Sequence, residues 1–350
     1  MRAGLSAGLA ALALAGCATA GTGPAARTAA ATVVTVQARG ETAAVATANA
    51  DAADDPAIWR NPADPAASLI VATDKQAGLH VYGLDGTDRS FLDAGRVNNV
   101  DLRDMGAAGI IVAASDRGDP LHAKLALFRL DPATATLTPL ARIDVGAGEA
   151  YGVCLYREGA VLHAFNIIKD GTIRQIELSL VGGAAQGRIV REMKLGTQSE
   201  GCVTDERTHQ LYVAEEDVGI WRFDARAAGS TAPIRVAAAD GVHLVADAEG
   251  LAIAASGPRD GGYLVVSSQG DSAYALYRLS DDSYVGRFRI VAGKVGGTEE
   301  TDGIEIATGD FGPGFPGGLM VVQDGVNPPR AQNFKLLAWG DVARALRLPR

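Results

Sequence analysis

Acidic side chains recur at two places in a repeating pattern, and their types are those of calcium ligands. One set follows a short apolar run in each repeat: Asp74, Asp116, Asp170, Glu215 to Asp217, Asp271 and Asp324. A second set lies before or between such runs: Asp54–Asp55, Asp101, Glu200, Asp247 with Glu249, and Asp302 with Glu305. No His or Cys stands at metal spacing, and oxygen donors alone favour Ca²⁺ or Mg²⁺ over zinc. Ca²⁺ fits better, because it accepts about six to eight oxygens in irregular geometry.

Three cations share one position in successive repeats. Lys75, Arg117 and Lys169 each follow the first apolar run of their repeat. Cations beside an acidic, metal-loaded surface suggest an anionic ligand, and phosphate fits because Arg and Lys bind its oxygens. Taken singly, each acid has the alternative of a solvated turn residue and each cation that of an ordinary surface charge. The prediction therefore depends on a fold that gathers them.

The elements that would position these residues are six hairpins. Each has a short apolar strand, a polar turn and a second strand. The predicted pairs are 69–72 with 78–82, 109–113 with 124–128, 161–165 with 172–176, 211–214 with 219–223, 263–267 with 273–277, and 318–322 with 333–337. A spacing of about 40 to 55 residues is typical of one four-stranded propeller blade. The sequence predicts an all-β fold, a six-bladed β-propeller; a series of two-sheet sandwiches is the alternative.

Composition narrows the classes of partner and reaction. The 350 residues carry 32 Lys and Arg against 41 Asp and Glu, for a net charge of -9, which argues against a nucleic acid or an anionic bilayer as the partner. The 43 glycines favour tight turns over a helical bundle. No G-x-x-x-x-G-K-[ST] loop, G-x-S-x-G elbow, cysteine-phosphatase loop or R-H-G run occurs. A phosphate ester would therefore be cleaved by metal-activated water.

The N-terminus reads as an export signal. Residues 1–17 contain one Arg followed by a short apolar stretch, and Leu14-Ala15-Gly16-Cys17 resembles the bacterial lipobox, in which Cys17 is lipidated. The alternative is an ordinary signal cleaved after residues 18–20. We expect an exported protein, periplasmic, extracellular or held at the outer membrane, that contacts membrane only through a lipid anchor. Residues 18–44 are predicted to form a flexible tether and residues 45–345 a single, monomeric propeller domain.

Two further cysteines remain, Cys154 and Cys202. An oxidising compartment permits a disulfide between them. The alternative, which we prefer at this stage, is two separate buried cysteines that act as small hydrophobic residues.

Nine short runs together resemble the β-propeller phytases, the alkaline, calcium-dependent phytate hydrolases. In chain order the runs are 54–59 (DDPAIW), 97–103 (VNNVDLR), 151–156 (YGVCLY), 198–201 (QSEG), 212–217 (YVAEED), 246–251 (ADAEGL), 267–270 (SSQG), 300–304 (ETDGI) and 322–325 (VQDG). The resemblance extends from about residue 45 to 340, and the order of the runs makes it specific. Two departures stand out: Asp271 replaces the Asn usual after SSQG, and the segment around Lys169 matches only loosely.

The resemblance implies a set of roles. The implied calcium ligands are Asp54, Asp55, Glu200, Glu216, Asp247, Glu249, Gln269 and Asp302. The implied phosphate-binding residues are Lys75, Arg117, Tyr151 and Lys169, which with Glu216 make up the catalytic set. It also implies several Ca²⁺ ions, an attacking water activated between them, and calcium phytate as substrate. A lactonase-like hydrolase with one central Ca²⁺, or a non-catalytic propeller that binds an anion, remains the alternative.

Overall fold

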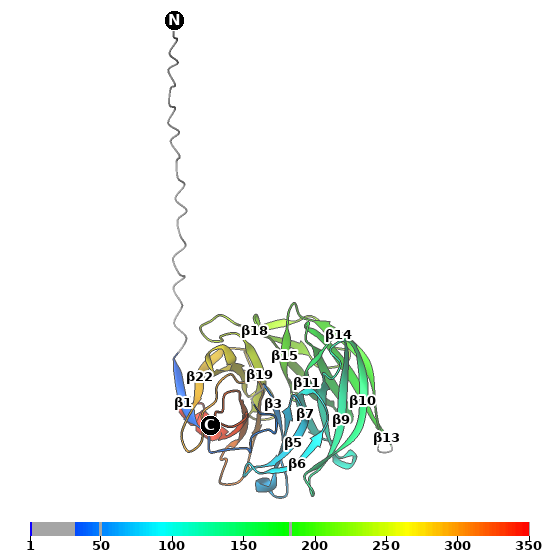
Figure 1. Cartoon of the computed structure of the whole chain (residues 1–350), viewed down its shortest axis with the longest axis horizontal. Coiled ribbons are helices and arrows are strands. Elements are labelled where there is room, and N and C mark those ends of the chain that lie inside the picture. Colours follow the sequence, from blue (N-terminus) through cyan, green and yellow to red (C-terminus); the bar gives the residue numbers. More distant parts are fainter. Residues whose placement is uncertain (2–31, 49–50, 182–183, 350) are drawn as a thin grey trace.

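Six β-sheets surround a central axis in the computed structural model, which describes Met1 and residues 32–48, 51–181 and 184–349 (Figure 1). Five sheets have four strands and one has five. The prediction of an all-β, six-bladed propeller is confirmed. A single short α-helix, α1 (Trp339–Ala345), follows the last strand.

The first three blades consist of consecutive strands. They are β3 (Ala53–Trp59), β4 (Leu69–Asp74), β5 (Gly78–Gly83) and β6 (Asp88–Asp93); β7 (Val97–Asp104), β8 (Ile110–Asp116), β9 (His122–Asp131) and β10 (Thr136–Ala147); and β11 (Ala150–Glu158), β12 (Val161–Ile168), β13 (Thr172–Val181) and β14 (Ala184–Lys194). Short 3₁₀ turns lie at Pro65–Ala67 and Gly106–Ala108.

The last three blades continue the pattern. They are β15 (Ser199–Asp205), β16 (Gln210–Glu215), β17 (Gly219–Asp224) and β18 (Ile234–Ala238); β19 (Ala248–Ala255), β20 (Gly262–Ser268), β21 (Ala273–Arg278) and β22 (Tyr284–Val291); and β23 (Ile304–Thr308), β24 (Gly318–Asp324) and β25 (Asn333–Ala338). A third 3₁₀ turn lies at Gln269–Asp271. All six predicted hairpins coincide with the second and third strands of the blades.

The core lies between the blades rather than within one layer. Second strands are apolar on both faces, so β4 and β8 are buried along their whole length, whereas the outer strand β6 alternates between exposed and half-buried residues. One apolar cluster fills each seam between adjacent blades, including the seam between the sixth blade and the first. Each blade thereby buries both faces against its neighbours, and the ring is held closed by apolar contact.

The N-terminal strands close the ring. β2 (Gly40–Glu41) is the outer strand of the sixth sheet, and β1 (Val33–Gln37) pairs in parallel with β22 (Figure 1). The prediction of a flexible tether over residues 18–44 is therefore wrong for these strands. Val36 is 7% exposed and packs between the last two blades, because the edges of those sheets offer partners that an Ala- and Thr-rich composition does not reveal.

The predicted signal lies outside the described residues. Residues 2–31 contain the lipobox-like run and Cys17, and the structure does not describe them. Within the part of the chain that is described, no helix combines the length and the hydrophobicity needed to cross a bilayer.

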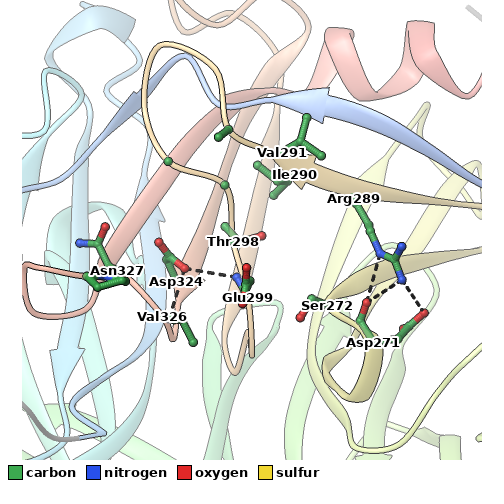
Figure 2. Close-up of a pocket in the computed structure, with 14 residues that line it drawn as sticks. Asp271, Ser272, Arg289, Ile290, Val291, Thr298, Glu299, Asp324, Val326 and Asn327 are labelled. Atoms are coloured by element: carbon green, nitrogen blue, oxygen red, sulfur yellow. Dashed lines mark hydrogen bonds and ion pairs between the residues drawn. The ribbon is translucent and has the colours of Figure 1, made fainter.

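A cavity of about 510 Å³ lies between the fifth and sixth blades, and Figure 2 shows its lining. Arg289 and Asp271 form an ion pair at 3.2 Å on one side, and Asp324 lies on the other. Asp271 and Asp324 of the recurring acidic set line this cavity, but none of the calcium or phosphate ligands implied by the resemblance does.

Candidate metal and anion site

Five inner strands carry a β-bulge at the same place, and Tyr151 and four of the predicted calcium ligands, Asp54, Asp55, Glu200 and Glu249, lie in these bulges. The register shifts fall between Ala53 and Pro56, Val97 and Val100, Ala150 and Val153, Ser199 and Cys202, and Ala248 and Leu251. A bulge re-aims the side chain that it carries. The bulge residues, with Asp302 just before β23, form what we call the inner ring: Asp54, Asn98, Tyr151, Glu200, Glu249 and Asp302.

A glycine follows four inner-ring residues and lets the next inner strand approach. A Cβ on Gly152 would lie 2.0 Å from the Glu200 carbonyl oxygen, a distance that no side chain tolerates. The equivalent distances are 2.3 Å from Gly201 to Glu249 O, 2.4 Å from Gly250 to Asp302 O and 2.5 Å from Gly303 to Asp54 O. The repeated ligand–Gly pair therefore sets the spacing of the inner ring.

A second set of residues follows the second strand of five blades, and we call it the outer ring: Lys75, Arg117, Lys169, Glu216 and Gln269. The backbone N–H of each donates to the carbonyl of the residue two positions before the inner-ring residue of its own blade. The bonds join Lys75 to Ala52 (2.6 Å), Arg117 to Arg96 (3.0 Å), Lys169 to Glu149 (3.0 Å), Glu216 to Gln198 (3.1 Å) and Gln269 to Asp247 (2.9 Å). The two rings are thus bound to each other blade by blade.

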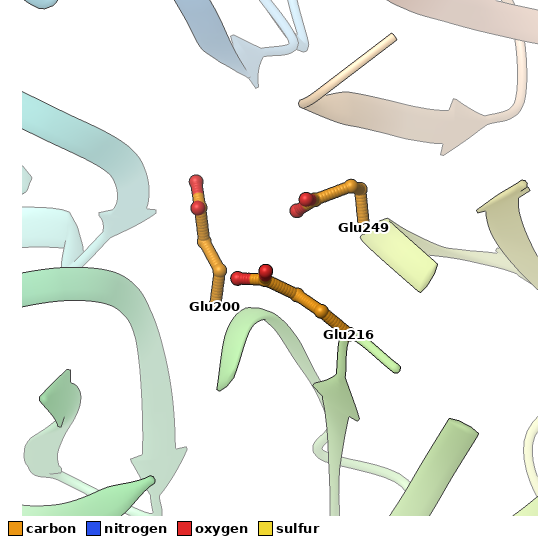
Figure 3. Close-up of side chains that lie close together, drawn as sticks. All are labelled: Glu200, Glu216 and Glu249. Atoms are coloured by element: carbon orange, nitrogen blue, oxygen red, sulfur yellow. The ribbon is translucent and has the colours of Figure 1, made fainter. Parts of the chain in front are cut away.

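Three buried carboxylates converge where the rings meet. Glu200, Glu216 and Glu249 each place an oxygen within 4.8 Å of the others, and Figure 3 shows them pointing toward one another. Their exposed fractions are only 5–6%. Burial raises the pKa of Glu200 well above its usual range, and nearby Asp54 and Asp302 raise it further. Three carboxylates this close require protons or a cation among them.

Asp54 fits a metal ligand by the same reasoning. It is fully buried, and neither carboxylate oxygen accepts a hydrogen bond. A buried carboxylate without such bonds is costly unless a cation compensates it. Lys75 supplies part of that charge, with its Nζ 3.5 Å from Asp54, 2.9 Å from Asp302 and 2.8 Å from Asp51. The donors here are all oxygens, which suits a hard divalent cation such as Ca²⁺.

Tyr151 lies between two outer-ring cations. The Lys169 Nζ is 4.7 Å and the Arg117 Cζ 5.5 Å from the centre of its ring. Arg117 also bonds Asn98 and pairs with Glu149 at 2.5 Å. Burial, with Glu200, Glu249 and Glu216, raises the pKa of the Tyr151 hydroxyl, so that group stays a neutral donor at physiological pH. Lys75, Arg117 and Lys169, which share one position in successive repeats, thus lie around the same carboxylates as Tyr151, which the resemblance implied.

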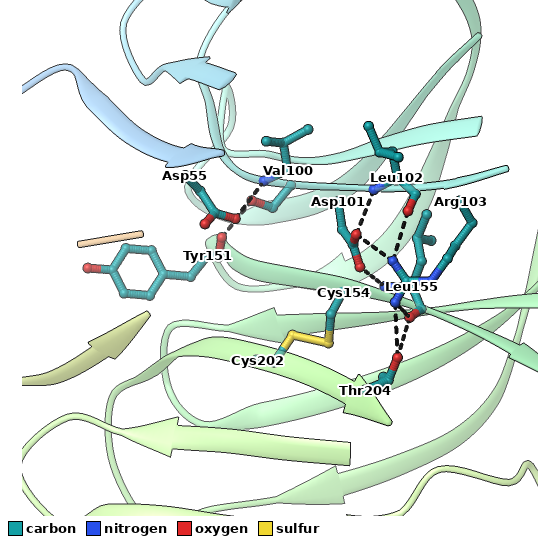
Figure 4. The surroundings of a disulfide bond; sticks show 11 residues. Asp55, Val100, Asp101, Leu102, Arg103, Tyr151, Cys154, Leu155, Cys202 and Thr204 are labelled. Carbon is teal, nitrogen blue, oxygen red and sulfur yellow. Dashed lines mark hydrogen bonds and ion pairs between the residues drawn. A yellow bond between two sulfur atoms is a disulfide. The ribbon is translucent and has the colours of Figure 1, made fainter. Parts of the chain in front are cut away.

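The remaining predicted ligands fall in two places. Gln269 Nε2 donates to the Asp302 carboxylate at 2.6 Å. Burial raises the pKa of Glu216, and the nearby Asp247 carboxylate raises it further. Gln269 and Asp247 therefore both belong to the site. Asp55 points away from it: its carboxylate accepts the Val100 N–H at 3.1 Å and lines a separate cavity of about 270 Å³ between the inner strands (Figure 4). Within this structure Asp55 does not join the Glu200 group.

Two amide side chains of the site, Asn98 and Gln198, were not predicted from the sequence. Asn98 donates to Glu200 at 2.8 Å, and Gln198 donates to Glu216 at 2.7 Å. Asn98 occupies in the second blade the place that Asp54 occupies in the first. Its equivalent position in the repeat could have revealed Asn98. It was overlooked because only charged side chains were compared between repeats. Glu149 pairs with Arg117, and Asp51 pairs with Lys75. These two carboxylates were not predicted because their partners are distant in sequence.

Cys154 and Cys202 form a disulfide, so the preferred prediction of two separate cysteines is wrong (Figure 4). They lie on β11 and β15, the inner strands of neighbouring blades. Their Cα atoms are 5.8 Å apart, within the range that a disulfide bridges. Residues 48 positions apart meet here only because the ring brings the two strands side by side.

Comparisons with known proteins identify the family of the chain. A sequence model of the family described as Phytase matches residues 3–348. The 3-phytase of Bacillus subtilis (strain 168) is 39% identical over 328 residues, which cover 89% of this chain and 85% of that protein. Among solved structures, the chain is similar to BBS1N from a complex with ARL6DN, at 10% identity and a TM-score of 0.46 over 77% of this chain and 74% of that one. A likeness that weak does not bear on function. The match over nearly the whole length and the 39% identity place the chain in the phytase family.

Proposed function

We propose that the protein is a calcium-dependent phosphomonoester hydrolase, a 3-phytase that releases phosphate from phytate (myo-inositol hexakisphosphate). Membership of the phytase family and the 3-phytase relative support the reaction class. The observation that carries the proposal is the meeting of three buried carboxylates with a cationic arm on one face. Such a surface holds an anion only when divalent cations neutralise it.

The residues that would hold calcium are those with oxygens at the site. Glu200, Glu216 and Glu249 provide the convergent carboxylates, and Asp54, Asp247, Gln269 and Asp302 surround them. Bound calcium would neutralise this cluster and supply an activated water for hydrolysis. We propose more than one ion, because Asp54 and Asp302 contact Lys75 whereas Glu200, Glu216 and Glu249 converge on one another.

The cations of the outer ring bind and orient phosphate. Lys75, Arg117 and Lys169 would donate to phosphate oxygens and stabilise the charge that grows on them during transfer. Tyr151 keeps its proton and donates a hydrogen bond to the same group. This three-cation arm also distinguishes the proposal from a lactonase-like hydrolase, which needs one axial metal and no such arm. Because phytate itself binds Ca²⁺, the substrate would be the calcium complex.

A direct assay tests the proposal. Purified protein is dialysed against EDTA, and phosphate release from phytate is followed as calcium is restored. Release that appears only with calcium supports the proposal, and release that is equal without calcium refutes it. In the same assay the Lys294→Ala variant, which removes an exposed cation outside both rings, should behave as the wild type does. It is the control for variants that remove a cation of the outer ring.

We also propose that the protein is exported and lipid-anchored through Cys17. The lipobox-like run at residues 14–17 supports this, as does the disulfide, because disulfides persist mainly outside the cytoplasm. Cys17→Ser should release the protein from the membrane fraction with its activity intact. A variant that still sediments with membranes would refute the anchor.

A further inference from the structure

Neighbouring inner strands are tied together just beneath the inner ring, and the ties differ from seam to seam. Between the first two blades, the Asp55 carboxylate accepts the Val100 N–H at 3.1 Å. Between the next two, Asp101 accepts the Leu155 N–H at 2.8 Å. At the following seam, β11 to β15, the Cys154–Cys202 disulfide lies at the corresponding level (Figure 4). A covalent bond replaces a polar contact there.

This disulfide lies close to two residues of the site. Cys154 follows Tyr151 by three residues on β11, and Cys202 follows Glu200 by two on β15. The two strands belong to different sheets, so no strand ladder fixes their spacing. The other described ties near this seam are hydrogen bonds: Gln198 Nε2 donates to the Tyr151 hydroxyl at 3.5 Å beside the site, and Thr204 Oγ1 donates to the Leu155 carbonyl at 2.7 Å further from it. The disulfide is therefore the covalent link between the two strands, and it lies two residues after Glu200 and three residues after Tyr151.

We propose that the Cys154–Cys202 disulfide is a positioning element for the metal site, holding the strand that carries Glu200 against the strand that carries Tyr151. Glu200 is one of the three convergent carboxylates, and its carbonyl packs against Gly152 beside Tyr151. Loss of the bond lets the two bulges separate, which loosens the carboxylate cluster and the phenol together. This inference rests on the proposed calcium function and assigns the cysteines a role in it.

Chemical access to the bond runs through the cavity of about 270 Å³. Cys202 lines this cavity together with Asp205 and Ala255, which lie further along the inner strands. A dithiol reductant that enters there would form a mixed disulfide and then its own cyclic disulfide. Cys154 and Cys202 become thiols and each takes up one proton.

The test compares calcium binding with stability. Calcium affinity is measured by isothermal titration calorimetry, and melting temperature by calorimetry, for the double variant Cys154→Ala/Cys202→Ala and for dithiol-reduced wild type. We expect calcium affinity to fall about 10-fold, as for other residues that support a metal ligand, and KM for phytate to rise. Reoxidation should restore the reduced wild type and leave the double variant unchanged.

Two controls separate the possible failures. Thr204→Val removes a tie at the same seam away from the site, so it should lower the melting temperature while calcium affinity holds. Glu200→Gln removes a proposed ligand. If Glu200→Gln weakens calcium binding but loss of the disulfide lowers only stability, the positioning role is overturned. If Glu200→Gln also leaves calcium affinity unchanged, the proposed calcium function itself is wrong.

Discussion

Blades one to three and blades four and five place different chemistry at the same backbone position. In the first three, the outer-ring residue is a cation: Lys75, Arg117 and Lys169. In the next two it is an oxygen donor, Glu216 or Gln269, held by the same backbone hydrogen bond. A repeated scaffold thus presents two groups of side chains on one face. We call Lys75, Arg117 and Lys169 the cationic arc, and the convergent Glu200, Glu216 and Glu249 the acidic arc. The acidic arc requires divalent cations, and the cationic arc requires an anion, so one ligand assembly satisfies both.

Removal of divalent cations should break the acidic arc and have the largest effect. EDTA should reduce phosphate release from phytate to background and lower the melting temperature, because bound ions stabilise the folded state by mass action. Differential scanning calorimetry and a phosphate assay measure the two effects. Activity and melting temperature that are both insensitive to EDTA would contradict the metal role of Glu200, Glu216 and Glu249.

Loss of one outer-ring cation should break the cationic arc alone. Arg117→Ala should lower kcat/KM for phytate about 100-fold, the scale expected when a group that stabilises transition-state charge is removed. The calcium-loaded melting temperature should change little, because the Arg117 side chain contacts the polar residues Asn98 and Glu149 rather than an apolar cluster between blades. Turnover equal to that of the Lys294→Ala control would remove Arg117 from the phosphate site.

A methyl group added at Gly152 should push apart the strands that carry Tyr151 and Glu200. Gly152→Ala would place a Cβ 2.0 Å from the Glu200 carbonyl, so β11 and β15 must move apart. We expect a loss of roughly 2–3 kcal/mol in the free energy of unfolding and weaker calcium binding. Gly314→Ala, where nothing lies within 4 Å, is the matched control and should be neutral. Equal stability of the two variants would show that strand spacing at Gly152 is adjustable.

The smallest effect is a pH dependence of the calcium-free protein. Burial and Asp54 raise the pKa of Asp302 to about 7 despite Lys75, and burial with Asp101 raises that of Glu305 to about 8. In unfolded chains these carboxyl groups have pKa values of about 4. At pH values between about 4 and the raised pKa values, the folded state binds more protons than the unfolded state, so the free energy of unfolding falls as pH rises. Melting temperature in EDTA should drop from pH 5 to 8, and calcium should flatten the change. A rise over that range would contradict the raised pKa values.

Much of the fold was predictable because each blade repeats one local pattern. A short apolar strand, a polar turn and a second strand recur six times, so 69–72 and 318–322 could be placed as equivalent strands. β1 and β2 could not, since their pairing with β22 and β25 is non-local and their composition resembles a linker. The ring is closed by pairing between strands that are far apart in the sequence, and neither strand alone predicts its partner.

The site divides in the same way. Residues with charge at a recurring position, such as Lys75 and Glu216, could be found by spacing. Asn98 was not predicted because an amide carries no charge, and Asp55 lies apart from the Glu200 group because adjacent bulge residues face different ways. The disulfide depends on the proximity of two inner strands, which follows from the closed ring and not from the sequence near either cysteine.

The most direct test is a crystal structure of the protein soaked with calcium chloride and inorganic phosphate. Our account predicts calcium ions bound to oxygens of Glu200, Glu216 and Glu249, and a phosphate that contacts these ions and the Lys75 and Arg117 side chains. Calcium bound elsewhere, with the three carboxylates still facing one another and no phosphate between the two arcs, would contradict it.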